Sequence, residues 1–127
     1  MTDLPPRFAP AATVTEAQRL LDHGAPEEAA TLLAGAAASA PDDELELWQG
    51  LALLTEGLTQ LTRRDNDAAA RSLRRGADLL GAHTANPPHA LDVPGLIAWA
   101  EHLVTELDEP AASARPDRPP VPRLRLP

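Results

Sequence analysis

Apolar side chains recur every three or four residues along most of the chain, which is the period of an α-helix with one buried face. Residues that stop helices separate these stretches, with Gly24, Pro41 and Gly81 at three of the ends. The pattern predicts five helices within residues 13–109. Their inward residues are Val14, Ala17, Leu20 and Leu21; Ala29, Ala30, Leu33, Ala36 and Ala37; Leu47, Leu51, Leu54, Leu58 and Leu61; Ala70, Leu73, Ala77 and Leu80; and Leu96, Ala100, Leu103 and Leu107.

Each stretch begins with residues that favour the start of a helix, because their side chains or missing N–H groups suit its first turn. These residues are Thr13 with Glu16 in capping-box spacing, Pro26, either Asp42 or Asp43, the Asp65-Asn66-Asp67 cluster, and Asp92. The second helix is expected to end near Ser39 and the fourth near Leu80.

The third stretch is the longest and is the predicted core helix. Gly50 and Gly57 lie two turns apart inside it. A glycine inside a helix costs about 1 kcal/mol relative to alanine, so we expect each to mark close approach of another backbone. Trp48 in this helix and Trp99 in the last helix are expected to anchor the core between them. The alternative is that one of the two lines a groove between helix pairs.

The second and fourth stretches match each other at the sequence offset that carries Ala29 onto Ala69, which indicates an internal repeat. The alternative is a chance match between two alanine-rich helices. Ala29, Ala30, Leu33 and Ala37 superpose on Ala69, Ala70, Leu73 and Ala77. Two hairpins with alanine-rich second helices are typical of tetratricopeptide-like stacking, in which small residues let neighbouring helices approach. Because such arrays usually need about three repeats, the fifth helix is expected to close the bundle. The predicted fold is all-α, a five-helix bundle of two stacked hairpins plus a closing C-terminal helix.

Composition supports this class. Alanine and leucine are by far the commonest residue types, whereas the chain has one Phe, two Trp, no Tyr, no lysine and no cysteine. Strands draw on aromatic and β-branched residues, so a sheet protein is disfavoured. Absent cysteine excludes disulfides and cysteine-based zinc sites. Usage rich in alanine, arginine and proline is what GC-rich coding produces, which suggests a bacterial, specifically actinobacterial, source.

Both ends of the chain are rich in proline, which removes backbone donors and blocks helices. We expect residues 1–12 and 110–127 to be disordered. Four of the eleven arginines but only one of the nineteen acids lie in residues 115–127. This tail is either a basic, extended ligand for another protein's groove or a solvated segment without a specific role.

The net charge of the chain is −8, and the excess of acids lies in residues 1–114, which carry seven arginines and 18 acidic residues. An acidic body repels nucleic acid and anionic membranes. No run of about 18 apolar residues is present, and the first residues lack the pattern of a signal peptide. We therefore expect a cytoplasmic protein that binds neither nucleic acid nor membrane.

Arginines cluster around the turn between the third and fourth helices. Guanidinium groups bind phosphate and carboxylate well, so Arg71, Arg74 and Arg75 are candidate interaction residues. The alternative is a salt-bridged outer face, formed by Asp67–Arg71, Arg74–Asp78 and Glu56 near Arg63.

Four histidines are the candidate metal ligands. His83, His89 and Asp92 could converge before the fifth helix, and His102 has a glutamate one turn later. A zinc site needs three or four ligands, and no compact signature supplies them. We therefore expect no metal and no cofactor, with His23 at a helix end, His102 on a solvated face and His89 holding its loop by hydrogen bonds.

Three segments resemble, in order and spacing, the domain-of-unknown-function family numbered 309, small helical proteins common in bacteria. They are Glu46-Leu47-Trp48-Gln49-Gly50-Leu51, Ser72-Leu73-Arg74-Arg75-Gly76-Ala77, and Pro88-His89-Ala90-Leu91-Asp92-Val93-Pro94-Gly95-Leu96. The resemblance covers about residues 15–107. The family's Ala-His-Glu motif is degenerate here, because Ala30, Thr31 and Ala34 stand where the family has His and two Glu. The resemblance implies the fold and argues against a shared catalytic site.

These features together predict a non-catalytic protein-interaction or scaffold module rather than an enzyme, with an unknown protein partner, as a monomer or weak homodimer. Recognition would use the groove between the hairpins, with Arg71, Arg74 and Arg75 at its rim, or the proline-arginine tail. The alternative function is a small-molecule or metal-binding protein that uses the loop of His89 and Asp92.

Overall fold

The computed structural model describes residues 9–85, 87–108 and 121–125 of the chain. Its α-helices are α1 (Pro10–Asp22), α2 (Pro26–Ser39), α3 (Leu45–Thr62), α4 (Asn66–Leu80) and α5 (Val93–Asp108). Short 3₁₀ turns lie between them: η1 (Asp42–Glu44), η2 (Gly81–His83) and η3 (Pro88–Ala90). The predicted all-α bundle is confirmed.

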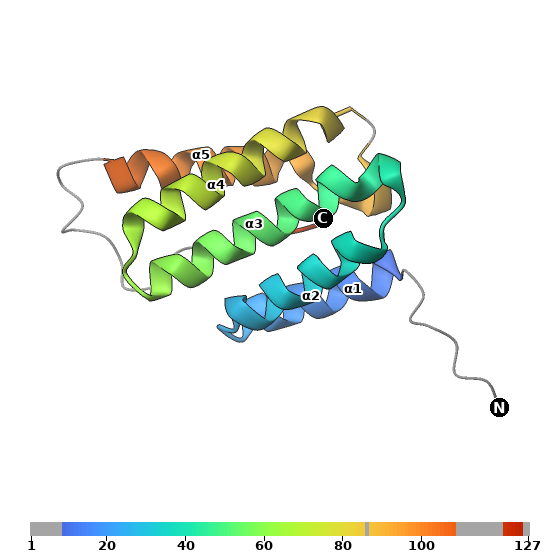
Figure 1. Ribbon diagram of the computed structural model, residues 1–127, viewed down its shortest axis with the longest axis horizontal. Coiled ribbons are helices and arrows are strands. Elements are labelled where there is room, and N and C mark those ends of the chain that lie inside the picture. The colour runs from blue at the N-terminus through green and yellow to red at the C-terminus, as the bar shows by residue number, and fades with distance from the viewer. Residues whose placement is uncertain (1–8, 86, 109–120, 126–127) are drawn as a thin grey trace.

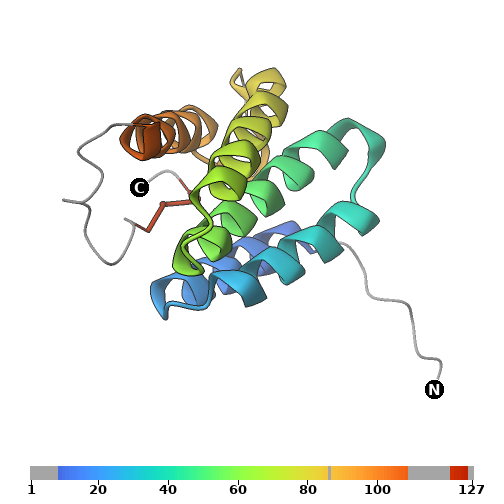
Figure 2. The same cartoon turned by 60° about the vertical axis from the view of Figure 1, so that its left-hand side comes forward.

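Each helix packs on the next one in the chain, from α1 on α2 to α4 on α5. The central helix is α3, with the α1–α2 pair on one side and the α4–α5 pair on the other (Figure 1). Turning the molecule keeps α3 between the two pairs (Figure 2). None of the helices in the described ranges is long and apolar enough to cross a membrane.

The two hairpin turns, α1–α2 and α3–α4, have the same backbone geometry. Gly24 has a φ of +75° in the first turn, and Arg64 has a φ of +60° in the second. In each turn the next N–H donates to the carbonyl five positions earlier, at 2.8 Å for Ala25 and 2.9 Å for Asp65. This pattern is a Schellman-type helix end. The two hairpin turns thus share one backbone conformation and hydrogen-bond pattern.

The start of α1 differs from the prediction. Pro10 stands in the first turn, where its missing N–H costs no hydrogen bond, and no side chain caps the helix. Thr13 lies inside the helix, and Glu16 pairs with an arginine one turn later instead of completing a capping box. The prediction of disorder is therefore wrong for residues 9–12, whereas residues 1–8 lie outside the described part.

Buried leucines, alanines and one tryptophan form the core. Trp48 has no exposed surface, which confirms it as a core anchor, and Leu33 and Leu73 are likewise fully buried at matching positions of the two hairpins. Trp99 is half-buried and packs against the edge of the core.

Glycines set the distance between α3 and α4. A Cβ added to Gly50 would lie 3.0 Å from the carbonyl oxygen of Gly76, and one added to Gly57 would lie 2.8 Å from Cγ of Leu73. The predicted close approach of another backbone is confirmed at Gly50, whereas Gly57 makes room for the side chain of Leu73, with the nearest backbone oxygen, that of Ala69, at 3.4 Å. The sequence reasoning missed Gly76, where a Cβ would lie 2.9 Å from the carbonyl oxygen of Gly50.

Residues 121–125, named the strap from here on, return to the bundle and pack between α1 and the segment before α5 (Figure 2). Leu124 is 2% exposed and belongs to the core. The prediction of a disordered tail over residues 110–127 is thus wrong for the strap, because Leu124 packs in the core and Pro122 is buried. Residues 109–120 and 126–127 lie outside the described part.

Candidate functional site

A groove of about 450 Å³ lies on the surface where α2, α3 and α4 meet. It is lined by Ala34, Ala37, Ala38, Leu45, Gln49, Ala52, Leu53, Arg75 and Leu79. The alanines of α2 leave this face open, since their side chains reach no further than Cβ. The lining is apolar apart from one amide and one guanidinium group. This hairpin groove, as we call it, corresponds to the surface predicted between the two hairpins.

The structure separates the three arginines predicted at the rim. Arg75 lines the hairpin groove, and Arg71 lies exposed one turn earlier on the same face of α4. In the part of the chain that the structure describes, no carboxylate lies within ion-pair distance of either side chain, so the predicted Asp67–Arg71 pair is not formed. Arg74 instead pairs with a residue of α5.

Arg74 holds α4 to α5 rather than facing a partner. Its Nη2 lies 2.7 Å from Oδ2 of Asp108, so the predicted pairing with Asp78 is wrong. Arg63 likewise pairs across helices, with Nη2 2.9 Å from Oε2 of Glu27, instead of meeting Glu56. Both pairs are exposed, and such pairs contribute about 0–1 kcal/mol.

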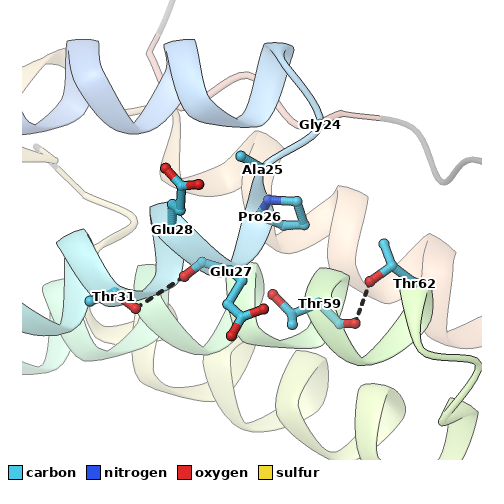
Figure 3. Close-up of a pocket in the computed structure, with 8 residues that line it drawn as sticks. All are labelled: Gly24, Ala25, Pro26, Glu27, Glu28, Thr31, Thr59 and Thr62. Carbon is cyan, nitrogen blue, oxygen red and sulfur yellow. Dashed lines mark hydrogen bonds between the residues drawn. The ribbon is translucent and has the colours of Figure 1, made fainter.

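A second hollow, of about 620 Å³, opens at the turn between α1 and α2 (Figure 3). Its walls carry Gly24, Ala25, Pro26, Glu27, Glu28, Thr31, Thr59 and Thr62. The threonine hydroxyls here are engaged with backbone carbonyls: Thr31 donates to Glu27 at 3.1 Å and Thr62 donates to Thr59 at 2.6 Å. Glu27 is engaged with Arg63. The three threonine hydroxyls and Glu27 therefore serve the local fold, and Glu28 is the remaining charged group of this hollow.

His89 belongs to a half-buried network of hydrogen bonds at the N-terminal end of α3. Its Nε2 lies 2.8 Å from Oε1 of Glu44, and the same oxygen accepts a hydrogen bond of 3.1 Å from Nε1 of Trp48. The expectation that His89 holds its loop by hydrogen bonds is confirmed. His89 and Ala90 both have positive φ, at +62° and +57°, which costs free energy in residues other than glycine. The contact with Glu44 helps to hold this strained turn in place.

Asp92 caps α5, as predicted. Its Oδ1 accepts a hydrogen bond of 3.1 Å from the N–H of Gly95, and Pro94 stands in the first turn. His89 and Asp92 thus serve separate structural contacts rather than one site. Among the described residues, no group of three or more His, Asp or Glu side chains is arranged to hold a metal ion.

His23 and His102 are exposed, and each contacts a nearby residue in the sequence. Nδ1 of His23 is 2.7 Å from the carbonyl oxygen of Arg19 at the end of α1. Nε2 of His102 is 2.8 Å from Oε1 of Glu106, one turn later on α5. Both positions agree with the structural interpretation of these histidines.

The hydrogen bonds to Glu44 predict a contribution to the free energy of unfolding that is lost at acidic pH. Burial raises the pKa of Glu44, but hydrogen bonds from His89 and Trp48 outweigh burial and hold this pKa below its usual value of 4.5. The unfolded chain therefore binds the proton more tightly than the folded chain. The stabilisation is present above about pH 4.5 and is lost as the pH falls through the folded pKa.

We expect Glu44→Gln to flatten the fall in unfolding free energy between about pH 5 and pH 3, because the group that titrates there is removed. Urea unfolding at half-unit pH steps measures this slope. Glu46→Gln is the matched control, an exposed glutamate on the first turn of α3. Equal slopes for wild type and Glu44→Gln would contradict the prediction.

Sequence reasoning missed several residues of these sites. Leu53 and Leu79 line the hairpin groove, and each directly precedes an inward leucine, so paired leucines were the signal for a second apolar face. The contact of Glu44 with His89 carried no signal, because His89 is far away in sequence, although Trp48, its other partner, lies only four residues later. Leu124 stood in a segment dominated by proline and arginine, whose composition concealed its packing.

Comparison of the chain with protein-family models, with curated proteins and with solved structures found no match in any of the three. The resemblance to the family numbered 309 therefore stays a prediction.

Proposed function

We propose that this chain is a non-catalytic protein-interaction module whose hairpin groove binds an amphipathic helix of a partner protein. The observation that carries the proposal is the groove itself, an apolar lining with the guanidinium group of Arg75 at its edge. Helix-in-groove recognition needs an apolar trough and rim groups that fix register.

The charges at the rim define the partner's chemistry. Arg71 and Arg75 lie one turn apart on α4 and meet no carboxylate within ion-pair distance in the described part of the chain. A partner helix with two carboxylates one turn apart, beside its apolar face, would pair with both guanidinium groups. An acidic amphipathic helix is therefore the partner that we propose.

The proposal includes a tetratricopeptide-like arrangement of the two hairpins. Matching hydrogen bonds in the two hairpin turns favour a tetratricopeptide-like arrangement, and the proposed docking surface lies between the two hairpins. The resemblance to the family numbered 309 points to a bacterial source and the same kind of fold. The proposal places the chain in the cytoplasm, where it would meet its protein partner as a monomer or weak homodimer.

Site-specific photocrosslinking in the native host tests the proposal. Gln49 lines the hairpin groove, and Glu101 lies exposed on α5, so benzoylphenylalanine at each position compares the groove with a control surface. We expect an adduct at position 49 that is absent at position 101. Mass spectrometry of the adduct is expected to locate an amphipathic segment with carboxylates one turn apart.

Charge reversal supplies the second part of the test. We expect Arg75→Glu to lower the yield of the position-49 adduct at least tenfold, a loss of about 1.4 kcal/mol, because like charges would face each other across the rim. Arg74→Glu is the matched control, since Arg74 pairs with α5. An adduct that withstands Arg75→Glu, or equal yields at positions 49 and 101, would overturn the proposal.

A further inference from the structure

The backbone of the strap is held by hydrogen bonds from two separate parts of the chain, α1 and the segment before α5, as a bound extended peptide would be. The side-chain amide of Gln18 makes two hydrogen bonds to it: Nε2 donates to the carbonyl of Pro122 at 3.1 Å, and Oε1 accepts from the N–H of Leu124 at 3.0 Å. The N–H of Asp92 also donates to the carbonyl of Leu124 at 2.8 Å, and Leu91 and Arg125 form an isolated antiparallel bridge. A glutamine that pairs with a donor and an acceptor in this way acts as a neighbouring strand does.

Side chains of the strap alternate between the core and the surface, as in a β-strand. Pro122 and Leu124 are buried, whereas Arg123 is exposed with Nη1 3.5 Å from Oδ2 of Asp22. Arg125 donates from Nη1 to the hydroxyl of Thr15 at 2.9 Å. The surface that receives the strap, which we name the strap groove, therefore selects an extended segment of the form Pro-Xaa-Leu-Arg.

The strap fills the strap groove incompletely. Val121 is 44% exposed and borders a hollow of about 350 Å³, whose apolar walls include Leu21, Pro26 and Leu58. Another hollow, of about 290 Å³, lies along α1 beside Arg125. A segment with a larger apolar residue in place of valine would bury more area in the first hollow.

We infer that the strap groove is a second binding site, for an extended segment of a partner protein of the form aromatic-Pro-Xaa-Leu-Arg, and that the chain's own strap occupies this site as a built-in competitor. Among the described residues, the hydrogen bonds to the strap come from α1 or from the segment before α5, and residues 109–120 separate the strap from α5. Exchange of the strap for a partner segment therefore breaks no helix. This site is independent of the hairpin groove.

Fluorescence polarisation with the full-length chain tests this inference. The probe is a labelled synthetic peptide with the sequence of residues 118–126 in which the valine is replaced (V121F). A tethered competitor acts at an effective concentration on the order of millimolar. We therefore expect the Leu124→Asp chain, whose strap cannot pack, to bind the probe at least tenfold more tightly than wild type does. Adding Gln18→Ala to that variant is expected to reverse the gain, and the V121F peptide is expected to outcompete the unmodified peptide.

A second measurement covers the case in which Leu124→Asp fails to fold, as judged by circular dichroism. Because the chain has no cysteine, Arg123→Cys gives one labelling site on an exposed part of the strap. We expect excess V121F peptide to displace the strap and change the emission of an attached environment-sensitive dye. No displacement at millimolar peptide would overturn the inference. A concentration-dependent dimer of wild type, with no preference for the V121F peptide, would also overturn it by identifying a second copy as the occupant.

Discussion

Trp48→Ala is expected to lower the free energy of unfolding by about 3–5 kcal/mol, the range for removing a fully buried aromatic side chain. Trp48 has no exposed surface and lies at the start of the central helix. Its indole donates to Glu44, which also contacts His89, so the substitution removes packing and one member of a hydrogen-bonded network together. The expected loss is a large part of the roughly 5–15 kcal/mol typical of a domain. Chemical unfolding followed by circular dichroism in the far ultraviolet measures it.

Trp48→Phe separates the contribution of core packing from that of the hydrogen bond to Glu44. Phenylalanine keeps an aromatic ring in the core but lacks the indole N–H, so Glu44 loses one donor. We expect a smaller loss of about 1–2 kcal/mol, the cost of a smaller side chain and a lost hydrogen bond. A change of less than about 1 kcal/mol for Trp48→Ala would contradict the assignment of this residue as the anchor of the core.

Much of the helical framework could be predicted from the spacing of apolar residues, because each helix buries one stripe. The ends at Gly24 and Ser39, the cap at Asp92 and the close approach at Gly50 all follow from local chemistry that a sequence displays. The start of α1 could not be predicted in the same way. Thr13 and Glu16 have capping-box spacing, yet Pro10 begins the helix without any side-chain cap.

A residue of the candidate sites could be predicted only where its position depends on a single helix. Arg75 reaches the hairpin groove because it shares a face of α4 with Leu79. Arg74 was assigned to the same rim, but its ion pair with Asp108 joins two different helices. Spacing along one helix says nothing about such distant partners, which depend on how the helices are arranged in space.

The contacts of the strap were even harder to predict, because they too depend on partners that are distant in the sequence. Its contacts with α1 join opposite ends of the sequence, such as Gln18 and Leu124. Proline content correctly indicated an extended backbone but gave no information on whether that backbone has a surface to bind. The apolar Val121 and Leu124 in this segment were the available signal.

Gly76→Ala is expected to destabilise the protein by about 1–2 kcal/mol, although alanine is the better helix former by about 1 kcal/mol. The added Cβ would lie 2.9 Å from the carbonyl oxygen of Gly50 and 3.2 Å from Cβ of Leu53. Neither atom is the end of a flexible side chain, so α3 and α4 must move apart, and the core leucines between them lose contact. Overpacking of this kind costs about 1–3 kcal/mol or more. Urea unfolding of the variant and wild type measures the difference.

Gly35→Ala is the matched control, because Gly35 also lies inside a helix but a Cβ there would meet nothing within 4 Å. We expect this variant to gain about 0.5–1 kcal/mol of stability from helix propensity alone. The same chemical change should thus have opposite signs at the two positions, which distinguishes close helix packing from propensity. Stabilisation by Gly76→Ala would mean that α3 and α4 do not approach as closely as Gly50 and Gly76 indicate.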